Sequence, residues 1–511
     1  MSFFFVSSSF ATTTTPKINV DYLNSLTGPK VTWETATESD SDIVLINGAY
    51  YKYTYNKPDD YTETSTKPSS YTNVNNIVFN NVAPTISGNG SVYGTIINNS
   101  RPSDKLVNFD LINSTWGSGL SVNGGAIYNT SEMQNINVSF INNTIEARNS
   151  GGGNIDNSGT IQNINGNFIN NRINTGPQGG IRGGVIYNNR SINNIEGTFF
   201  NNSITKNSGM GGYIMDYAKG GAIYNSGTIS LTNSSFFSNY IKTDDTNKSN
   251  AQGGAIYNEG TLNISANDGK QSIFSGNKII YKNSSGNYVE ESNAIHMAGG
   301  TLNLNSTYNG LIQFNDGISG SNYTINIDGD DTGRIELNNK ISGLSSMDIT
   351  GSNVYFGENS YINYIINNTG GSIHNAKIEN GGVLNITSGG SSVGTRINSG
   401  GTLNLSAVDG GQIIFDDKIT ASTGSENTAL EINSISYNRA SETSALFIGE
   451  KYFLSPDQYE NGINSYLDEY VNQALNDWGV SIPEICFYLM RKIPTGLCPN
   501  YSACQTERSQ R

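Results

Sequence analysis

The sequence predicts an all-β chain built as a parallel β-helix solenoid, which we expect to be right-handed, with a short C-terminal helical segment. Three observations lead to this fold class. A Gly-Gly-x-Ile-x-Asn box recurs five times, a Phe-x-x-Asn box follows each copy, and the residues around them alternate between apolar and polar. Only 14% of the 511 residues are charged, and Gly, Asn, Ser and Thr are abundant, which suits short strands and turns.

The glycine-containing boxes recur at intervals that lie within the range of periods typical of solenoids. They begin at Gly124, Gly152, Gly183, Gly220 and Gly253, and a degraded sixth copy, SNAIHM, begins at Ser292. In the first four units the second glycine and the phenylalanine keep one spacing, as from Gly125 to Phe140. In the fifth unit the spacing is longer, from Gly254 to Phe274, and it includes the turn signal Asp268-Gly269. We therefore expect stacked coils whose loops of differing length leave from one corner.

Stacking would place equivalent residues of successive units above one another at about 4.8 Å. The box isoleucines and the phenylalanines then become two interior columns, and burying each side chain contributes about 1.5–3 kcal/mol. The glycines suit a corner that needs positive φ. The box asparagines suit the next corner, where they tolerate the left-handed conformation and can hydrogen-bond from unit to unit as a ladder. These are Asn129, Asn157, Asn188, Asn225 and Asn258.

Four tyrosines follow the box isoleucines by one residue, so alternation points them out of the solenoid. They are Tyr128, Tyr187, Tyr224 and Tyr257, and they form the candidate binding face of the chain. Two interpretations stay open at this stage. The rings either contact a ligand or stack on one another and only stabilise the coils.

Composition divides the chain into four parts. We expect residues 1–11, a short apolar run followed by small residues, to be the remnant of a signal peptide whose start lies upstream. Residues 12–79 are expected to be a strand-rich N-terminal or cap region, and residues 80–421 the β-helix. Residues 422–511 form a C-terminal region with an amphipathic helix near 456–477, which would cap the open end of the solenoid, and a tail that carries all three cysteines.

The bulk numbers exclude several classes of function. A net charge of −14 repels phosphate backbones, so we expect no nucleic-acid partner. Three cysteines confined to the tail support neither a disulfide framework nor a metal site, and we expect no cofactor. No run of about 18 apolar residues is present, so the sequence predicts no transmembrane helix.

The paired boxes resemble the repeats of the chlamydial polymorphic outer-membrane proteins, a family of autotransporter passenger domains. A second pattern, with glycine pairs at Gly381 and Gly400, resembles the passenger repeats of diffuse-adherence-type autotransporter adhesins. The two likenesses cover residues 124 to about 415. They imply an exported, virulence-associated bacterial adhesin at the outer membrane, on the cell surface or in the extracellular space. Its implied partners are host or neighbouring-cell surface proteins or glycans, or further copies of itself. The family reaches the outer membrane through a translocator barrel, and we expect that contact to need a barrel beyond these 511 residues.

An enzyme is the rival class, because a polysaccharide lyase or hydrolase can also use a β-helix. Such an enzyme needs carboxylates clustered with Arg, Lys or His on one face. The only histidines are His296 and His374, the acidic residues are spread thinly, and the turn at 328–331 suits solvent better than calcium. We therefore expect a non-catalytic adhesion protein without catalytic or metal-binding residues. A lyase or hydrolase and a purely structural, self-associating surface protein stay as alternatives.

Overall fold

The computed structural model describes most of the chain before residue 408 and five short segments after it. The described residues are 18–40, 43–66, 74–82, 91–175, 180–207, 217–387, 389–398, 401–407, 412–415, 420–421, 435–437, 445–448 and 453–454. The expected signal-peptide remnant, the helix near 456–477 and the cysteine tail lie outside them. The chain forms two compact units, the first ending near Tyr323 and the second continuing from Leu344, with the intervening residues divided between them.

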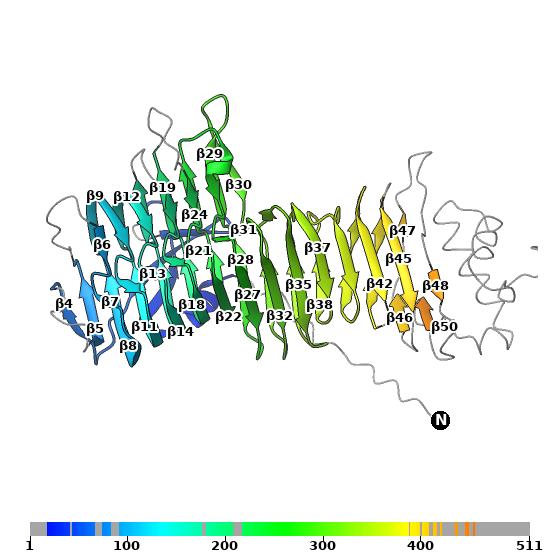
Figure 1. Cartoon of the computed structure of the whole chain (residues 1–511), viewed down its shortest axis with the longest axis horizontal. Coiled ribbons are helices and arrows are strands. Elements are labelled where there is room, and N and C mark those ends of the chain that lie inside the picture. The colour runs from blue at the N-terminus through cyan, green and yellow to red at the C-terminus, as the bar shows by residue number, and fades with distance from the viewer. Residues whose placement is uncertain are drawn as a thin grey trace, which may run out of the picture. The chain divides into compact units, whose positions relative to one another are not determined.

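The first unit contains a parallel β-helix, which confirms the fold class predicted from the repeats. Each coil contributes strands to three parallel sheets, and Figure 1 shows the strands of successive coils side by side. Sheet 1 contains β5 (Asn75–Asn80), β8 (Ser103–Ile112), β11 (Glu132–Ile141), β14 (Thr160–Ile169), β18 (Ser191–Phe200), β22 (Thr228–Thr232), β23 (Ser235–Phe237), β27 (Thr261–Ala266), β28 (Gln271–Ser275), β32 (Thr301–Ser306) and β33 (Leu311–Phe314).

The other two sheets are made of shorter strands. Sheet 2 contains β7 (Ile97–Asn99), β10 (Ile127–Asn129), β13 (Ile155–Asn157), β17 (Ile186–Asn188), β21 (Ile223–Asn225), β26 (Ile256–Asn258), β31 (Ile295–Met297) and β34 (Ile318–Gly320). Sheet 3 contains β6 (Ser91–Tyr93), β9 (Thr115–Asn123), β12 (Thr144–Gly151), β15 (Arg172–Thr175), β16 (Ile181–Arg182), β19 (Ser203–Lys206), β20 (Ala218–Lys219), β24 (Tyr240–Thr243), β25 (Ala251–Gln252), β29 (Lys278–Lys282) and, antiparallel to it, β30 (Tyr288–Ser292).

The box isoleucines pair in register along sheet 2 and are fully buried, as the spacing predicts. The first glycine of each box has φ between +61° and +76°, so the corner does require glycine. A Cβ on Gly220 would lie 2.0 Å from the carbonyl oxygen of Ile223. One coil more begins at Gly94, where the degenerate box GTIINN escaped sequence reasoning because it keeps only one of the two glycines.

The box asparagines form the predicted ladder, although not in the predicted conformation. Each donates from Nδ2 to the Oδ1 of the next coil at 2.6–2.8 Å, from Asn99 through Asn129 and on to Asn258. They end the strands of sheet 2 with ordinary backbone angles, so the expectation of left-handed residues at these positions is wrong. The left-handed asparagines lie elsewhere, at Asn142, Asn170 and Asn201 after the interior phenylalanines, where sheet 1 turns toward sheet 3.

A second buried ladder uses the asparagine of the Phe-x-x-Asn box. Asn143, Asn171, Asn202 and Asn239 each donate to the next coil at 2.9 Å, and each also donates to a carbonyl oxygen of the preceding coil. These side chains satisfy backbone groups that a corner inside the solenoid would leave without partners. The ladder ends when Asn277 donates to the buried carboxylate of Asp316 at 2.8 Å.

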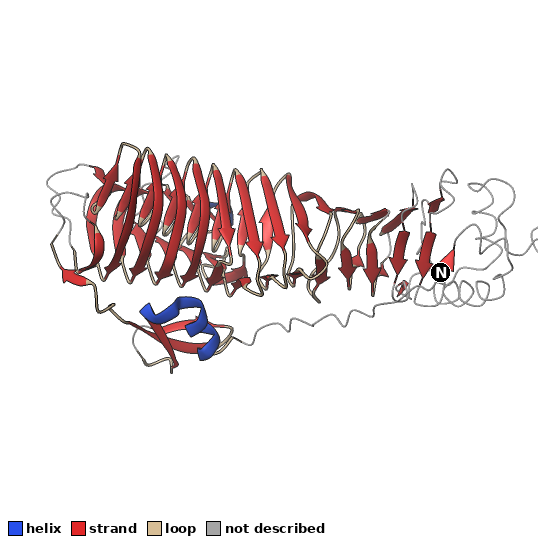
Figure 2. Cartoon of the chain, turned by 90° about the horizontal axis from the view of Figure 1, so that it is seen from below, coloured by secondary structure: helices blue, strands red, loops and turns tan. Residues whose placement is uncertain are grey.

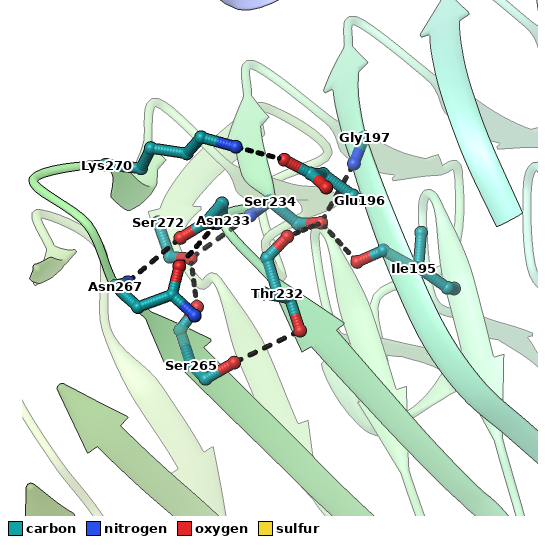
Figure 3. A network of polar contacts seen from close by, with 10 residues as sticks. All are labelled: Ile195, Glu196, Gly197, Thr232, Asn233, Ser234, Ser265, Asn267, Lys270 and Ser272. Atoms are coloured by element: carbon teal, nitrogen blue, oxygen red, sulfur yellow. Dashed lines mark hydrogen bonds and ion pairs between the residues drawn. The ribbon is translucent and has the colours of Figure 1, made fainter. Parts of the chain in front are cut away.

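The interior phenylalanines stack as predicted. From Phe168 to Phe314 the ring centroids of successive coils are 4.4–4.8 Å apart. Beside this column β18 is one continuous strand, whereas the next coils break into two strands at a corner that Ser234 and Ser272 stabilise (Figure 3). Ser234 Oγ donates to the Ile195 carbonyl oxygen at 2.9 Å, and Ser234 N donates to Ser272 Oγ at 3.1 Å. Coil length thus varies here and also between β24 and β25, so the expectation of a single variable corner is wrong.

A small domain precedes the solenoid within residues 12–79. It contains helix α1 (Val20–Thr27) and an antiparallel sheet of β1 (Val31–Thr35), β2 (Ile43–Ile46) and β3 (Ala49–Tyr55). Asn19 caps the helix by accepting from Tyr22 N, and Gly28 ends it at φ +64°. Strand β4 (Thr62–Thr64) then pairs with β5 and leads into the coils.

This N-terminal domain packs against the outside of sheet 1, as Figure 2 shows. The residue after each interior phenylalanine or leucine points outward, and it is a buried apolar residue in five consecutive coils: Ile112, Ile141, Ile169, Phe200 and Phe237. Trp33 lies on Phe200 with the ring centroids 4.7 Å apart. At the rim of the contact Lys30 pairs with the buried Asp110 at 2.9 Å.

The second unit has shorter coils. Its strands include β37 (Leu344–Ile349), β38 (Asn353–Phe356), β39 (Ile365–Asn368), β40 (Ser372–His374), β41 (Lys377–Ile378), β42 (Val383–Thr387), β43 (Ser391–Val393), β44 (Arg396–Ile397) and β45 (Thr402–Ala407). Leu384 pairs with Ile366 on one side and with Leu403 on the other, which is the short repeat that the glycine pairs predict. The interior is mainly aliphatic, although Phe356 and Asn368 are also buried, and the ladder formed by Asn367, Asn385 and Asn404 lies on the outer face.

Candidate functional site

The four candidate tyrosines lie on the outer face of sheet 2, in a row that we call the tyrosine stripe. Tyr187, Tyr224 and Tyr257 pair in register on β17, β21 and β26. Their rings stack, with centroids 5.2 and 5.3 Å apart, and His296 continues the stack 5.4 Å beyond Tyr257. Tyr128 lies on the other side of an interruption, because β13 carries Asp156 at the equivalent position.

The stripe is open to solvent only at one end. Tyr128 and Tyr187 are half-buried, whereas the side chains of Tyr224 and Tyr257 are only 3% exposed. Burial and the neighbouring Glu259 raise the pKa of both buried phenols well above the usual range, so they stay protonated. For Tyr224 and Tyr257 the faces of the rings therefore contact each other and their neighbours, which favours the stacking interpretation for these two residues.

Two cations lie beside the stripe. Arg182 and Lys219 each precede the glycine pair of their coil and pair in register on β16 and β20 of sheet 3. The glycine corner turns the chain sharply, so these side chains reach back over the tyrosines of sheet 2. Lys219 Nζ lies 4.2 Å from the ring centroid of Tyr257, and Arg182 Cζ lies 5.3 Å from that of Tyr224. Both contacts have the distance of a cation–π interaction.

Glu259 connects these groups into one polar cluster. It accepts from Tyr224 Oη at 2.6 Å and from Tyr257 Oη at 3.1 Å, and it pairs with Lys219 Nζ at 3.5 Å. Lys219 Nζ also donates to Tyr257 Oη at 2.6 Å. Burial lowers the pKa of Lys219 although Glu259 opposes the shift. We call the set formed by Arg182, Tyr217, Lys219, Tyr224, Tyr257 and Glu259 the tyrosine–cation cluster.

Asp156 is a buried carboxyl group in the middle of the stripe. Its Oδ1 atom has no hydrogen-bond partner, and burial raises its pKa to about 7. The neighbouring rings in register are those of Tyr128 and Tyr187, which supply no positive charge. Burial therefore favours the protonated form of this carboxyl group, which breaks the stack of rings into two parts.

Sequence reasoning found the tyrosines but missed Arg182, Lys219 and Glu259. A signal was present, since the residue before each glycine pair occupies one column, and that column changes from Gly151 to two consecutive cations. Glu259 directly follows the ladder residue Asn258, where the other coils carry Thr, Ser or Asn. Neither column belongs to the box that defines the repeat.

The two histidines lie in different places and do not form a common site. His296 ends the tyrosine stack, and burial lowers its pKa to about 4, so its imidazole is neutral at physiological pH. Its Nδ1 atom lies 3.0 Å from Ser319 Oγ. His374 stacks on Tyr355 in the second unit. Within the described residues no group of three or more His, Cys, Asp or Glu side chains could hold a metal ion.

Comparison of the chain with models of protein families, with curated proteins and with solved structures gives no match. In the part of the chain that the structure describes, no helix is long and apolar enough to cross a membrane. The arrangement of side chains in the tyrosine–cation cluster therefore carries the functional argument.

Proposed function

We propose that the chain is an exported, non-catalytic bacterial surface protein that acts in adhesion or cell-surface interaction. The observation that carries this proposal is the tyrosine–cation cluster, which gathers aromatic rings and two cations on the outer face of a solenoid. Aromatic residues and arginine are the side chains most enriched where proteins bind their partners. The resemblance of the boxes to autotransporter passenger repeats supports the same function.

The interior of the solenoid supports a scaffold role for the remaining repeats. Its polar side chains bond mainly to the next coil, as the two asparagine ladders do from Asn99 to Asn258 and from Asn143 to Asp316. These side chains hold the coils together and are not available to contact a partner. Host or neighbouring-cell proteins or glycans, or further copies of the chain, are the proposed partners.

Display of the chain on a non-adherent bacterium tests the proposal. We expect antibody to reach the chain on intact cells of the source organism. We also expect bacteria that display the chain to adhere to host or neighbouring cells more than the same strain without the chain. Adherence should fall when Tyr187→Ala and Arg182→Met are combined. A chain found only inside intact cells, or displayed bacteria that adhere no better than the parent strain, would contradict the proposal.

One observation favours the enzyme alternative, a polysaccharide lyase or hydrolase. Lys219 has a lowered pKa and donates to Tyr257 Oη at 2.6 Å beside Glu259, so a proton-transfer pair lies in the same cluster as the cation Arg182. Incubation of the purified chain with acidic and neutral polysaccharides would release new reducing ends or unsaturated uronides if this alternative holds. Lys219→Met should then abolish the release, and its absence from every substrate would remove the alternative.

A further inference from the structure

The charges of the tyrosine–cation cluster do not balance. Arg182 and Lys219 are in register on neighbouring strands, which lie about 4.8 Å apart, and like charges in register repel one another. Glu259 is 3.5 Å from Lys219 and neutralises that residue. Among the described residues no carboxylate lies within ion-pair distance of Arg182, and Glu259 acts on it only from farther away, so one carboxylate serves two positive charges.

The guanidinium group of Arg182 is nevertheless held in a defined orientation. Its Cζ atom lies 5.2 Å from the ring centroid of Tyr217 and 5.3 Å from that of Tyr224, one contact from each side of the glycine corner. The Nε atom is buried and has no hydrogen-bond acceptor. A guanidinium group presents its donors as a planar fork that matches a carboxylate in two-point contact, and leaving such a donor without a partner is unfavourable.

The tyrosines beside Arg182 indicate which kind of ligand supplies a carboxylate to it. Tyr187 and Tyr128 are half-buried, so part of each ring is open along the stripe on the side away from Tyr257. Tyr187 stacks on Tyr224 with one face, and its other face is turned toward the shorter side chain of Asp156. That free aromatic face suits the face of a sugar ring better than it suits the side chains of an acidic peptide. Because the whole chain carries a net charge of −14, polyanions are repelled in general, and any that bind must use a local site.

We propose that Arg182, with Lys219 beside it, binds the carboxylate of a uronic-acid polysaccharide whose sugar rings lie along Tyr187 toward Tyr128. The proposal rests on the proposed function in surface interaction and names the chemistry of the ligand. It requires recognition of one carboxylate at a time by the planar fork, with the ring contacts supplying the preference for a saccharide.

Binding of the full chain to polygalacturonate is the direct test. We expect binding at low ionic strength that is lost in about 1 M salt, where charges are screened within roughly 3 Å. Arg182→Met should weaken it by about 10- to 100-fold, which corresponds to one charge-assisted interaction of about 1.5–3 kcal/mol. Arg190→Met is the matched control, because that exposed arginine lies outside the cluster, and it should leave binding unchanged.

Three further arms make the outcome decisive. Fully methyl-esterified polygalacturonate keeps the sugar rings without the charge and should not bind, and polyglutamate should not bind because it lacks the rings. Arg182→Lys keeps the charge but loses the fork, so it should fall between the wild type and Arg182→Met, and it replaces that variant if Arg182→Met fails to fold by circular dichroism.

Equal binding of the wild type and both Arg182 variants would overturn the inference. Equal binding of the methyl ester or of polyglutamate would overturn it too. Adherence of displaying bacteria to cells that carry no uronic-acid polymer would in that case still support the proposed function, so the two proposals can fail separately.

Discussion

The long coils of the first unit and the short coils of the second solve the same packing problem with different side chains. The long coils enclose a wide interior, which they fill with a phenylalanine stack and two buried asparagine ladders. The short coils enclose a narrower interior that aliphatic side chains such as Leu384 fill, and their asparagine ladder lies on the outer face. The long coils also carry an outer asparagine row, from Asn113 through Asn142 to Asn170, so the difference between the units is the pair of buried ladders.

A second difference is that the N-terminal domain covers one face of the long coils, and we call this domain the cover. Only there, among the described residues, does the outward residue after the interior column stay apolar over consecutive coils, and the N-terminal domain buries that row under Trp33 and Leu23. A nearest-neighbour stack of coils is cooperative only over short distances. A domain that contacts five coils at once couples them, so the long coils should unfold more cooperatively than the short ones.

Removing the largest side chain of the cover should have the largest effect. Trp33→Ala should destabilise the first unit by about 3 to 5 kcal/mol, since it deletes a buried ring that packs on Phe200 and Tyr53. Hydrogen exchange should quicken in β14 and β18 and stay unchanged in β42. Leu45→Ala, at a side chain 43% exposed in the same domain, should change stability by less than about 0.5 kcal/mol. Equal protection of β14 in wild type and Trp33→Ala would show that the cover does not couple the coils.

The loss of a ladder asparagine should destabilise the first unit more than the second. Asn202→Ala should cost about 3 kcal/mol, because the side-chain amide and the backbone N–H of Asn171 and the Phe168 carbonyl oxygen each lose the buried hydrogen bond that Asn202 supplies. The matched change Asn385→Ala, on the outer face of the short coils, should cost less than about 1 kcal/mol because water replaces the lost bonds. Urea denaturation of the two variants measures the difference, and equal losses would contradict the comparison.

The end of the second ladder should make the first unit sensitive to pH. Burial outweighs four hydrogen bonds and raises the pKa of Asp316 to about 6. The folded chain therefore holds this proton between about pH 4 and 6 while the unfolded chain has lost it, so stability falls as the pH rises through that window. A shift of about two units corresponds to roughly 2 to 3 kcal/mol. This component should vanish in Asp316→Asn, and parallel pH profiles of wild type and variant would refute it.

The smallest effect is expected at the surface of the corner drawn in Figure 3. Lys270 Nζ lies 2.7 Å from Glu196 Oε1, but the side chains are 57% and 42% exposed. Lys270→Ala should therefore change the free energy of unfolding by about 0 to 1 kcal/mol, and the change should shrink further in high salt. Thermal unfolding at two salt concentrations provides the measurement. A loss several times larger than this range would mean that the ion pair holds the coils together more firmly than its exposure allows.

The sequence predicts the solenoid well because each repeat contains the residues that form its corners and its interior columns. Gly220, Ile223, Asn225 and Phe236 play parts that recur in register, so a role read in one coil carries to the next. The left-handed asparagines could not be placed in the same way, since Asn142 and Asn143 are adjacent and only the corner geometry distinguishes them.

The candidate site was only half predictable, because it forms between two sheets. Tyr224 lies in a box, but Arg182 and Glu259 belong to neighbouring coils. Arg182 reaches the Tyr224 ring across the glycine corner, and Glu259 accepts from its hydroxyl group. The docking of the N-terminal domain was hidden for a similar reason. An outward Ile141 or Phe237 reads as part of the repeat until a distant segment covers it.

The position of the N-terminal domain also fixes an order of events in time. Ser238 Oγ donates to the Leu45 carbonyl oxygen, and Ser275 Oγ donates to Asn47 Oδ1 at 2.7 Å, across 193 and 228 residues of chain respectively. The N-terminal domain is synthesised before these strands, so it cannot complete its contacts until they have wound into place. The apolar contacts can form coil by coil from Ile112 onward, and the contact of Ser275 with Asn47 is among the last to form.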